Sequence, residues 1–213
     1  MNNLSEIAII CAIAYLVGSI PTGVIVTKFA KGVDIRSYGS GSSGATNVAR
    51  TLGPKLGGLV LILDILKGYI SIYIISHIAN DYWIIPFSGF LLGLGHCYPI
   101  YIKFRGGKGI TTGFGTLIFL SPIAMALSLI GVSIAIITRY ISLGSIIGTL
   151  LSLLSLLFFS IYEIFGSKHD DLLYCIPVGL IILLRHRSNF LRLIRGKEGK
   201  LENKASPKKK KFR

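Results

Sequence analysis

Residues 110–137 read ITTGFGTLIFLSPIAMALSLIGVSIAII, and this stretch sets the number of helices in the chain. It is the longest apolar run of the sequence, and Ser121-Pro122 lies in its middle. Proline removes a backbone hydrogen-bond donor and disfavours helix at the residue before it. The run is therefore either one kinked helix or two short helices, and the rest of the sequence has to distinguish them.

Further apolar runs lie on both sides of this stretch, at residues 7–27, 56–78, 83–102, 143–165 and 172–184. The chain has 213 residues, of which 52% are hydrophobic and 15% charged, and its mean hydropathy is +0.68. Water-soluble domains are less apolar. A helix of about 20 apolar residues spans the hydrocarbon core of a bilayer. The sequence predicts an all-α, polytopic membrane helix bundle without a second, soluble domain.

The positions of Lys and Arg distinguish one helix from two in residues 110–137. There are 23 Lys and Arg against 9 Asp and Glu, and in so apolar a chain this net charge of +14 indicates membrane topology rather than nucleic-acid binding. With two helices and an outside N-terminus, residues 28–55, 103–108, 139 and 185–213 all lie in the cytoplasm. With one helix, the last two segments would lie opposite the first two. We therefore predict seven transmembrane helices, with the N-terminus out and the C-terminus in.

The two ends of the chain are predicted to differ. Glu6 precedes the first run and no small-residue cleavage site follows it, so residues 7–27 are expected to remain as a span. Residues 196–213 are polar and lysine-rich without apolar periodicity, which indicates a disordered, basic cytoplasmic tail. Residues 1–195 then form a single transmembrane domain. Its cysteines stand in separate apolar runs without disulfide or zinc spacing, as packing residues do.

A first polar segment, residues 32–58, reads GVDIRSYGSGSSGATNVARTLGPKLGG. Its glycines allow backbone amides to turn toward a ligand, and its hydroxyl and amide side chains add donors. If a helix begins at Ala45, the side chains three residues apart at 47 and 50 share one face. The segment is either an anion cradle or a flexible loop, and it lacks the lysine-hydroxyl pair of a nucleotide P-loop. Its candidate ligand contacts are Ser40, Gly41, Thr46, Asn47 and Arg50.

A second polar segment, residues 95–116, reads GHCYPIYIKFRGGKGITTGFGT. Lys103, Arg105 and Lys108 surround the turn Gly106-Gly107 just before the next apolar run. Cations at a helix N-terminus oppose the helix dipole unless an anion binds both. A bound phosphate would resolve this conflict, although the glycines also permit close helix packing. The single His96 is interpreted as a packing residue.

A third polar segment, residues 185–200, reads RHRSNFLRLIRGKEGK. An amphipathic interfacial helix explains most of its arginines. It does not explain His186 and Asn189, which are three residues apart and can point into the bundle from one face. A neutral histidine beside an amide suits binding of a polyol phosphate or transfer of a proton. Asp64 and Lys67, inside the second apolar run, are expected to pair with each other.

Several chemistries are disfavoured by what the sequence lacks. No His is followed five residues later by Asp, which argues against a His-Asp acyltransferase. Metal-dependent transfer of phosphoalcohols needs clustered carboxylates, and the predicted cytoplasmic side has only Asp34, Glu198 and Glu202. What remains is a site without metal or cofactor that binds phosphate and meets a lipid tail. An organic-anion transporter is the main alternative, and a non-catalytic lipid-binding scaffold is a third.

Four motifs in order, GSIPTG, GVDIRSYGSGSSGATNVARTLG, KFRGGKG and RHRSN, resemble the bacterial acyl-phosphate:glycerol-3-phosphate acyltransferase family (PlsY) over residues 18–198. The resemblance implies a seven-span inner-membrane acyltransferase with its active site at the cytoplasmic face. It implies transfer of a fatty acyl group from acyl phosphate to the sn-1 hydroxyl of glycerol 3-phosphate, giving lysophosphatidic acid and phosphate, the first step of phospholipid synthesis. Ser42-Ser43 stand where the family commonly has Asn and an apolar residue.

The resemblance also implies the site residues and partners. The predicted catalytic residues are Ser40, Arg50, Lys108, His186 and Asn189. The predicted substrate-binding residues are Gly41, Thr46, Asn47, Lys103, Arg105, Gly106 and Gly107. Arg50 and Lys108 would neutralise phosphate while Ser40 and the loop amides hold the donor. The partners are glycerol 3-phosphate, fatty acyl phosphate and membrane lipids, without nucleic acid or an obligate protein partner. An acyl-enzyme is not required, and either His186 or the donor phosphate accepts the proton.

Overall fold

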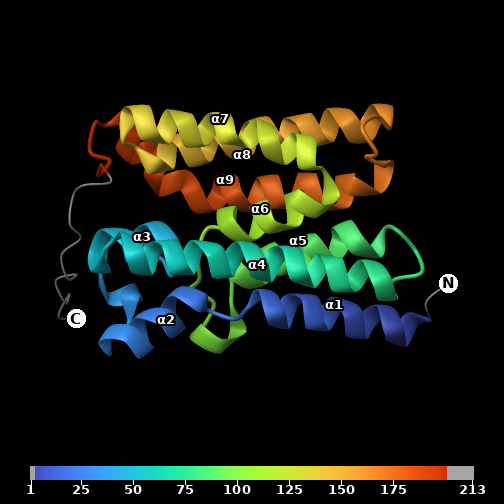
Figure 1. The fold of residues 1–213 in the computed structure, drawn as a ribbon, viewed down its shortest axis with the longest axis horizontal. Coiled ribbons are helices and arrows are strands. Elements are labelled where there is room, and N and C mark those ends of the chain that lie inside the picture. Colours follow the sequence, from blue (N-terminus) through green and yellow to red (C-terminus); the bar gives the residue numbers. More distant parts are fainter. Residues whose placement is uncertain (1–2, 201–213) are drawn as a thin grey trace.

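The computed structural model describes residues 3–200, and this part of the chain is all-helical, as predicted (Figure 1). Its α-helices are α1 (Leu4–Gly18), α2 (Thr22–Lys31), α3 (Ala45–Leu52), α4 (Pro54–Ile78), α5 (Ile84–Cys97), α6 (Ile110–Leu120), α7 (Pro122–Thr138), α8 (Ile141–Tyr162) and α9 (Leu172–Ile194). Short 3₁₀ turns η1 (Ile35–Ser37), η2 (Ile100–Ile102) and η3 (His169–Asp171) join some of them. The last apolar run and the start of the third polar segment thus form one helix, α9.

The longest apolar run, residues 110–137, is two helices. Ser121 is extended, with φ −155° and ψ 90°, and its side chain accepts a hydrogen bond from the backbone amide of Ala124. Pro122 occupies the first turn of α7, where its missing N–H has no intrahelical partner to lose. Figure 1 shows α6 and α7 running in opposite directions. The serine therefore caps α7, and the proline ends one helix and starts the next.

Four helical stretches are long and apolar enough to cross a membrane: Leu4–Lys31, Pro54–Ile78, Ile84–Ile102 and Ile141–Tyr162. Helices α6 and α7 are apolar but shorter. The start of α1 and the end of α9 lie at opposite ends of the bundle, and α2 and α3 lie at the α9 end (Figure 1). The number of spans and the orientation of the termini remain predictions. Most of the predicted tail, residues 201–213, lies outside the described residues.

Close packing of the helices depends on glycines. A Cβ on Gly115 of α6 would lie 2.1 Å from the carbonyl oxygen of Ile65 on α4. A Cβ on Gly131 of α7 would lie 2.3 Å from the carbonyl oxygen of Gly144 on α8. Small residues let helix backbones approach where lipid gives no hydrophobic driving force between helices. These two contacts pack α6 closely on α4 and α7 closely on α8.

The charged pair inside the second apolar run forms as predicted. Lys67 Nζ lies 3.2 Å from Asp64 Oδ1, and both side chains are buried. Lys67 Nζ also donates to the carbonyl oxygens of Gly18 and Ile20, each at 3.1 Å, where the backbone breaks between α1 and α2. His96 Nδ1 lies 3.6 Å from Asp64 Oδ1. The pair therefore satisfies the broken end of α1 as well as its own charges.

Candidate active site

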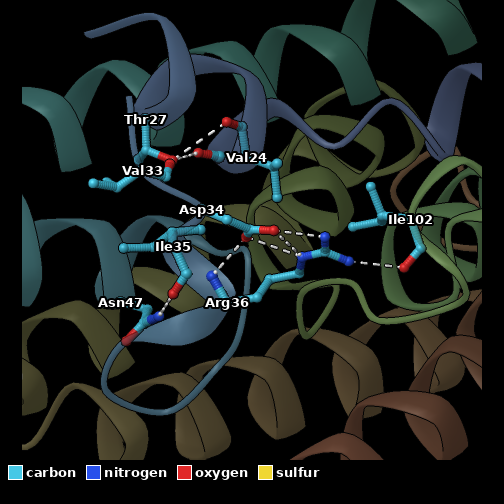
Figure 2. A network of polar contacts seen from close by, with 9 residues as sticks. Val24, Thr27, Val33, Asp34, Ile35, Arg36, Asn47 and Ile102 are labelled. Atoms are coloured by element: carbon cyan, nitrogen blue, oxygen red, sulfur yellow. Dashed lines mark hydrogen bonds and ion pairs between the residues drawn. The ribbon is translucent and has the colours of Figure 1, made fainter. Parts of the chain in front are cut away.

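The first polar segment is folded around the side chain of Asn47, on α3. Its Nδ2 donates to the carbonyl oxygens of Ile35, Tyr38 and Ser42 at 3.2, 3.2 and 2.9 Å, and its Oδ1 accepts from the Ser40 amide at 3.1 Å. Figure 2 shows the bond to Ile35. These bonds use both polar atoms of the Asn47 amide. Asn47 therefore holds the loop that contains Ser40 in its conformation.

Arg36 connects the first polar segment to the second. Its Nη2 lies 2.6 Å from Asp34 Oδ2, and its Nη1 donates to the carbonyl oxygen of Ile102 at 2.9 Å (Figure 2). The hydrogen bond from Arg36 lowers the pKa of the Asp34 carboxyl below its ordinary value. The guanidinium, held by this carboxylate, therefore fixes one loop against the other.

Arg185 connects the second polar segment to the third. Its Nε donates to the carbonyl oxygen of Gly107 at 3.0 Å, and its Nη2 donates to that of Gly106 at 3.1 Å. A Cβ on Gly107 would lie 2.0 Å from His96 Nε2, so this turn needs glycine to pack against the end of α5. The two glycines thus dock the loop on its neighbours.

Lys108, His186 and Asn189 meet where the second and third segments touch. Lys108 Nζ donates to Asn189 Oδ1 at 2.6 Å. Both His186 and Asn189 are buried on one face of α9, as their spacing predicts. His186 Nδ1 lies 2.9 Å from the Ile182 carbonyl oxygen, which only accepts, so Nδ1 carries a proton. Burial lowers the pKa of Lys108 to about 8.

Two adjoining cavities open at this meeting point. The apolar cavity, about 300 Å³, is walled by side chains of α4, α6, α7 and α8, among them Leu61, Phe114, Val132, Ala135, Ile136 and Ile141. The polar cavity, about 580 Å³, is lined by Tyr98, Arg185, Arg187, Ser188 and Arg192 among others. Ser40, Ser42, Lys108 and Asn189 line both. A molecule with an apolar tail and an anionic head can therefore place its head at these four residues.

The structure brings together eight of the twelve predicted site residues. Those that line one or both cavities are Ser40, Gly41, Thr46, Asn47, Arg50, Lys108, His186 and Asn189. Lys103, Arg105, Gly106 and Gly107 line neither cavity. Lys103 and Arg105 are exposed, because the turn after η2 directs them away from the bundle. Only Lys108, which immediately precedes the N-cap of α6, reaches the cavities from the cationic cluster.

Sequence reasoning gave no site role to several residues that the structure places here, among them Tyr98, Arg185 and Glu198. Tyr98 and Arg185 line the polar cavity. Glu198 lines the apolar cavity, although the sequence assigned it to the tail. Arg185 could have been found from its position at the end of the last apolar run, where an arginine needs anionic or carbonyl partners. Glu198 carried no such signal, because lysines surround it in the sequence.

The described residues contain no group of three or more His, Cys, Asp or Glu side chains placed to hold a metal ion. The cationic and amide groups at the cavity junction are suited instead to a phosphate, whose charge Lys108 and Arg50 can balance and whose oxygens can accept from them. The apolar cavity suits a hydrocarbon chain. The arrangement therefore fits a phosphate group joined to an acyl chain.

Comparison with known proteins gives the same picture. The sequence profile of the family described as glycerol-3-phosphate acyltransferase matches residues 8–196. The glycerol-3-phosphate acyltransferase of Aquifex aeolicus (strain VF5) is 42% identical over 187 residues, which cover 87% of this chain and 94% of the relative. That of Thermoanaerobacter sp. (strain X514) is 39% identical over 197 residues, covering 92% of this chain and 96% of the relative.

Two solved structures also resemble the chain. The glycerol 3-phosphate form of PlsY, an integral membrane glycerol 3-phosphate acyltransferase, is 40% identical and superimposes with a TM-score of 0.82. The lysophosphatidic acid form is 38% identical, with a TM-score of 0.79. Each comparison covers 92% of this chain and 95% of the other. The protein is thus a multi-pass membrane protein, and it belongs to the glycerol-3-phosphate acyltransferase family.

Proposed function

We propose that the protein transfers a fatty acyl group from acyl phosphate to the sn-1 hydroxyl of glycerol 3-phosphate and releases lysophosphatidic acid and phosphate. One observation carries the proposal: the apolar and the polar cavity share Ser40, Ser42, Lys108 and Asn189. A donor with a chain in one cavity can present its acyl phosphate to an acceptor in the other. The relatives' names and the two PlsY forms support this assignment over an organic-anion transporter.

The donor binds with its chain among the side chains of α4, α6, α7 and α8. Its phosphate lies at the cavity junction, where Lys108 contributes charge and the loop around Ser40 contributes hydroxyl and backbone donors. Arg50 also lines the apolar cavity beside this loop. Preorganised donors of this kind stabilise charge as it moves onto a leaving group. Glycerol 3-phosphate occupies the polar cavity, where Arg185, Arg187 and Arg192 balance its phosphate.

The reaction is a direct transfer. The sn-1 hydroxyl oxygen attacks the carbonyl carbon of the donor, the new ester bond forms, and the bond from that carbon to the phosphate oxygen breaks. The hydroxyl proton passes to the departing phosphate. His186 and Asn189 orient glycerol 3-phosphate so that the hydroxyl meets the carbonyl. Phosphate is a good leaving group, so the acyl group of the donor is already activated. No acyl-enzyme is therefore needed.

The same proposal includes the location of the site. Residues 1–195 form the transmembrane acyltransferase domain with seven spans, α1 together with α4 to α9. Of the predicted basic tail, residues 196–213, the described part packs against this domain through Glu198 and Gly199. The cavities open at the end of the bundle that carries α2, α3 and the end of α9. We assign this end to the cytoplasmic face of the bacterial inner membrane, because it carries the cationic loops.

The test is a reaction assay with the full chain purified in detergent. We expect acyl phosphate and glycerol 3-phosphate to give lysophosphatidic acid and inorganic phosphate in equal amounts, and acyl-CoA to give neither product. Reactions without protein correct for spontaneous hydrolysis of the donor. Product from acyl-CoA but not from acyl phosphate would contradict the proposal that acyl phosphate is the donor. No lysophosphatidic acid from either donor would contradict the proposed function.

A further inference from the structure

Glu198 folds back from the end of α9 into the apolar cavity, and its side chain is 1% exposed. Its Oε1 accepts from Ser142 Oγ at 2.8 Å and from Asn189 Nδ2 at 2.9 Å. Its Oε2 accepts from Arg192 Nε at 2.6 Å. Burial alone would raise the pKa of this carboxyl, but these three hydrogen bonds lower it. Glu198 is therefore an ionised carboxylate held in place by α8 and α9.

The carboxylate determines which way the amide of Asn189 faces. A carboxylate only accepts hydrogen bonds, so Asn189 must turn its NH₂ group toward Glu198. This leaves Asn189 Oδ1 toward Lys108 Nζ, at 2.6 Å. The reversed amide would place its NH₂ group against the ammonium and its oxygen against the carboxylate, and both contacts would repel. The position of Lys108 thus depends on Glu198 through one intervening side chain.

The residue after Glu198 fixes a second cationic group. The Gly199 carbonyl oxygen accepts from Arg50 Nη2 at 2.6 Å. Residues 197–200, which we call the C-terminal strap, therefore connect α3, α8 and α9. The family profile ends at residue 196, before this strap begins. Of the two predicted phosphate-binding cations, Arg50 contacts the strap directly and Lys108 is connected to it through Asn189.

We propose that Glu198 is a positioning residue for acyl transfer: it acts through Asn189, which it orients, and thereby holds the Lys108 ammonium at the junction of the two cavities. This inference rests on the proposed function. In the described residues Lys108 Nζ makes one hydrogen bond to an oxygen, which leaves two of its three donors for a phosphate. Glu198 does not line the polar cavity, so it does not occupy the place assigned to glycerol 3-phosphate.

The first test measures steady-state kinetics of E198A and E198Q with acyl phosphate and glycerol 3-phosphate. Loss of an orienting partner behind a contact residue costs about 10- to 100-fold in activity. We expect kcat of E198A to fall by this amount, and kcat of E198Q to fall less because its amide oxygen still accepts. KM for glycerol 3-phosphate should rise at the same time, because Asn189 also orients this substrate. E163Q is the matched control, since Glu163 is exposed and follows the other end of α8.

The second test separates positioning from a general loss of structure. The charged and titratable groups around Lys108 are Glu198 on the strap, Arg50 on α3, and Arg185, His186 and Arg192 on α9. The negative charge of Glu198 raises the pKa of Lys108, because it stabilises the charged ammonium. Removal of the carboxylate lowers the pKa of Lys108, so the high-pH fall of kcat/KM moves to lower pH in E198Q. A structural defect reduces the amplitude without moving the curve.

The outcomes are distinct. Parental kcat and an unshifted pH profile in both variants would overturn the inference. A lower KM for glycerol 3-phosphate at unchanged kcat would also overturn it, because Glu198 would then compete with the substrate phosphate. Thermal unfolding in detergent establishes that each variant folds, and if E198A does not, E198Q carries the test. Absence of product from the unmodified protein contradicts the proposed function instead.

Discussion

Lys108 is the residue at which the two cavities, the loop around Ser40 and helix α9 meet. Its ammonium contacts Asn189 and lines both cavities. Burial lowers its pKa to about 8, while the charge of Glu198 opposes this shift and three arginines add to it. Lys108 therefore loses its charge close to physiological pH, at the site where a phosphate has to be bound.

This pKa predicts the pH dependence of the reaction. Lys108 is charged below its pKa of about 8 and neutral above it. We expect kcat/KM to be level on the acidic side of this value and to fall about tenfold per pH unit on the basic side, since kcat/KM reports ionisations of the free enzyme. Lys108→Arg keeps its charge and should abolish the fall even if the rate is lower. Lys103→Arg, exposed and outside both cavities, is the matched control, and a fall that persists in Lys108→Arg would assign the ionisation elsewhere.

His186 is the second residue whose role can be separated by kinetics. If it orients glycerol 3-phosphate, His186→Gln loses about one hydrogen bond, and KM should rise about tenfold with kcat largely kept. If it is the base, kcat should fall and the ionisation that controls it should disappear. We expect the first result, measured as kcat and KM over a range of pH. His77→Gln, an exposed histidine in the last turn of α4, should change neither quantity.

At the scale of elements, local signals in the sequence were sufficient to predict where helices break. They were not sufficient to predict contacts between residues far apart in the chain. Ser121-Pro122 predicted a break, and the distribution of Lys and Arg chose two helices over one, as the structure has them. The predicted phosphate contact of the turn Gly106-Gly107 stays a prediction, but the docking of this turn against His96 and Arg185 was not predicted. Nothing in the local sequence gives that proximity, because it arises where α5 and α9 pack. The contacts of Glu198 escaped prediction for the same reason.

The docking of α3 on α4 can be tested with two neighbouring glycines. A Cβ on Gly57 would lie 2.5 Å from Ala49 Cβ and 2.8 Å from Ala49 Cα, whereas a Cβ on Gly58 would meet nothing within 4 Å. Overpacking costs about 1–3 kcal/mol. We expect Gly57→Ala to destabilise the protein by this amount and to lower kcat, because α3 carries Asn47 and Arg50. Gly58→Ala should be neutral or stabilising by about 0.5–1 kcal/mol, since alanine favours helix. Thermal unfolding and activity measure both, and equal behaviour of the two variants would show that α3 is not held by this contact.

At the scale of the whole molecule, the two ends of the bundle differ in charge and in content. One end carries α2, α3 and the end of α9 (Figure 1). Residues of all three polar segments line the cavities. The other end carries Glu163, Asp170 and Asp171 around η3. Charge asymmetry along a bundle of apolar helices indicates its orientation in the membrane. The proposed orientation explains why the site residues gather at one end: all three polar segments would leave the bilayer on that side.

Cysteine labelling tests this orientation and the two-helix interpretation of residues 110–137 together. Lys103 and His169 are exposed and separated by α6, α7 and α8. If each of these helices crosses the bilayer, the two positions lie on opposite sides, whereas a single crossing by α6 and α7 would put them on the same side. We expect a membrane-impermeant maleimide to label His169→Cys in intact cells and Lys103→Cys only after permeabilisation. The parent protein is the background control, because Cys97 and Cys175 are buried and Cys11 is partly so. Labelling of both positions from one side would show that α6 and α7 do not each cross the bilayer. A reversed pattern would place the catalytic end outside the cell, away from the cytoplasmic pool of glycerol 3-phosphate on which the proposed reaction depends.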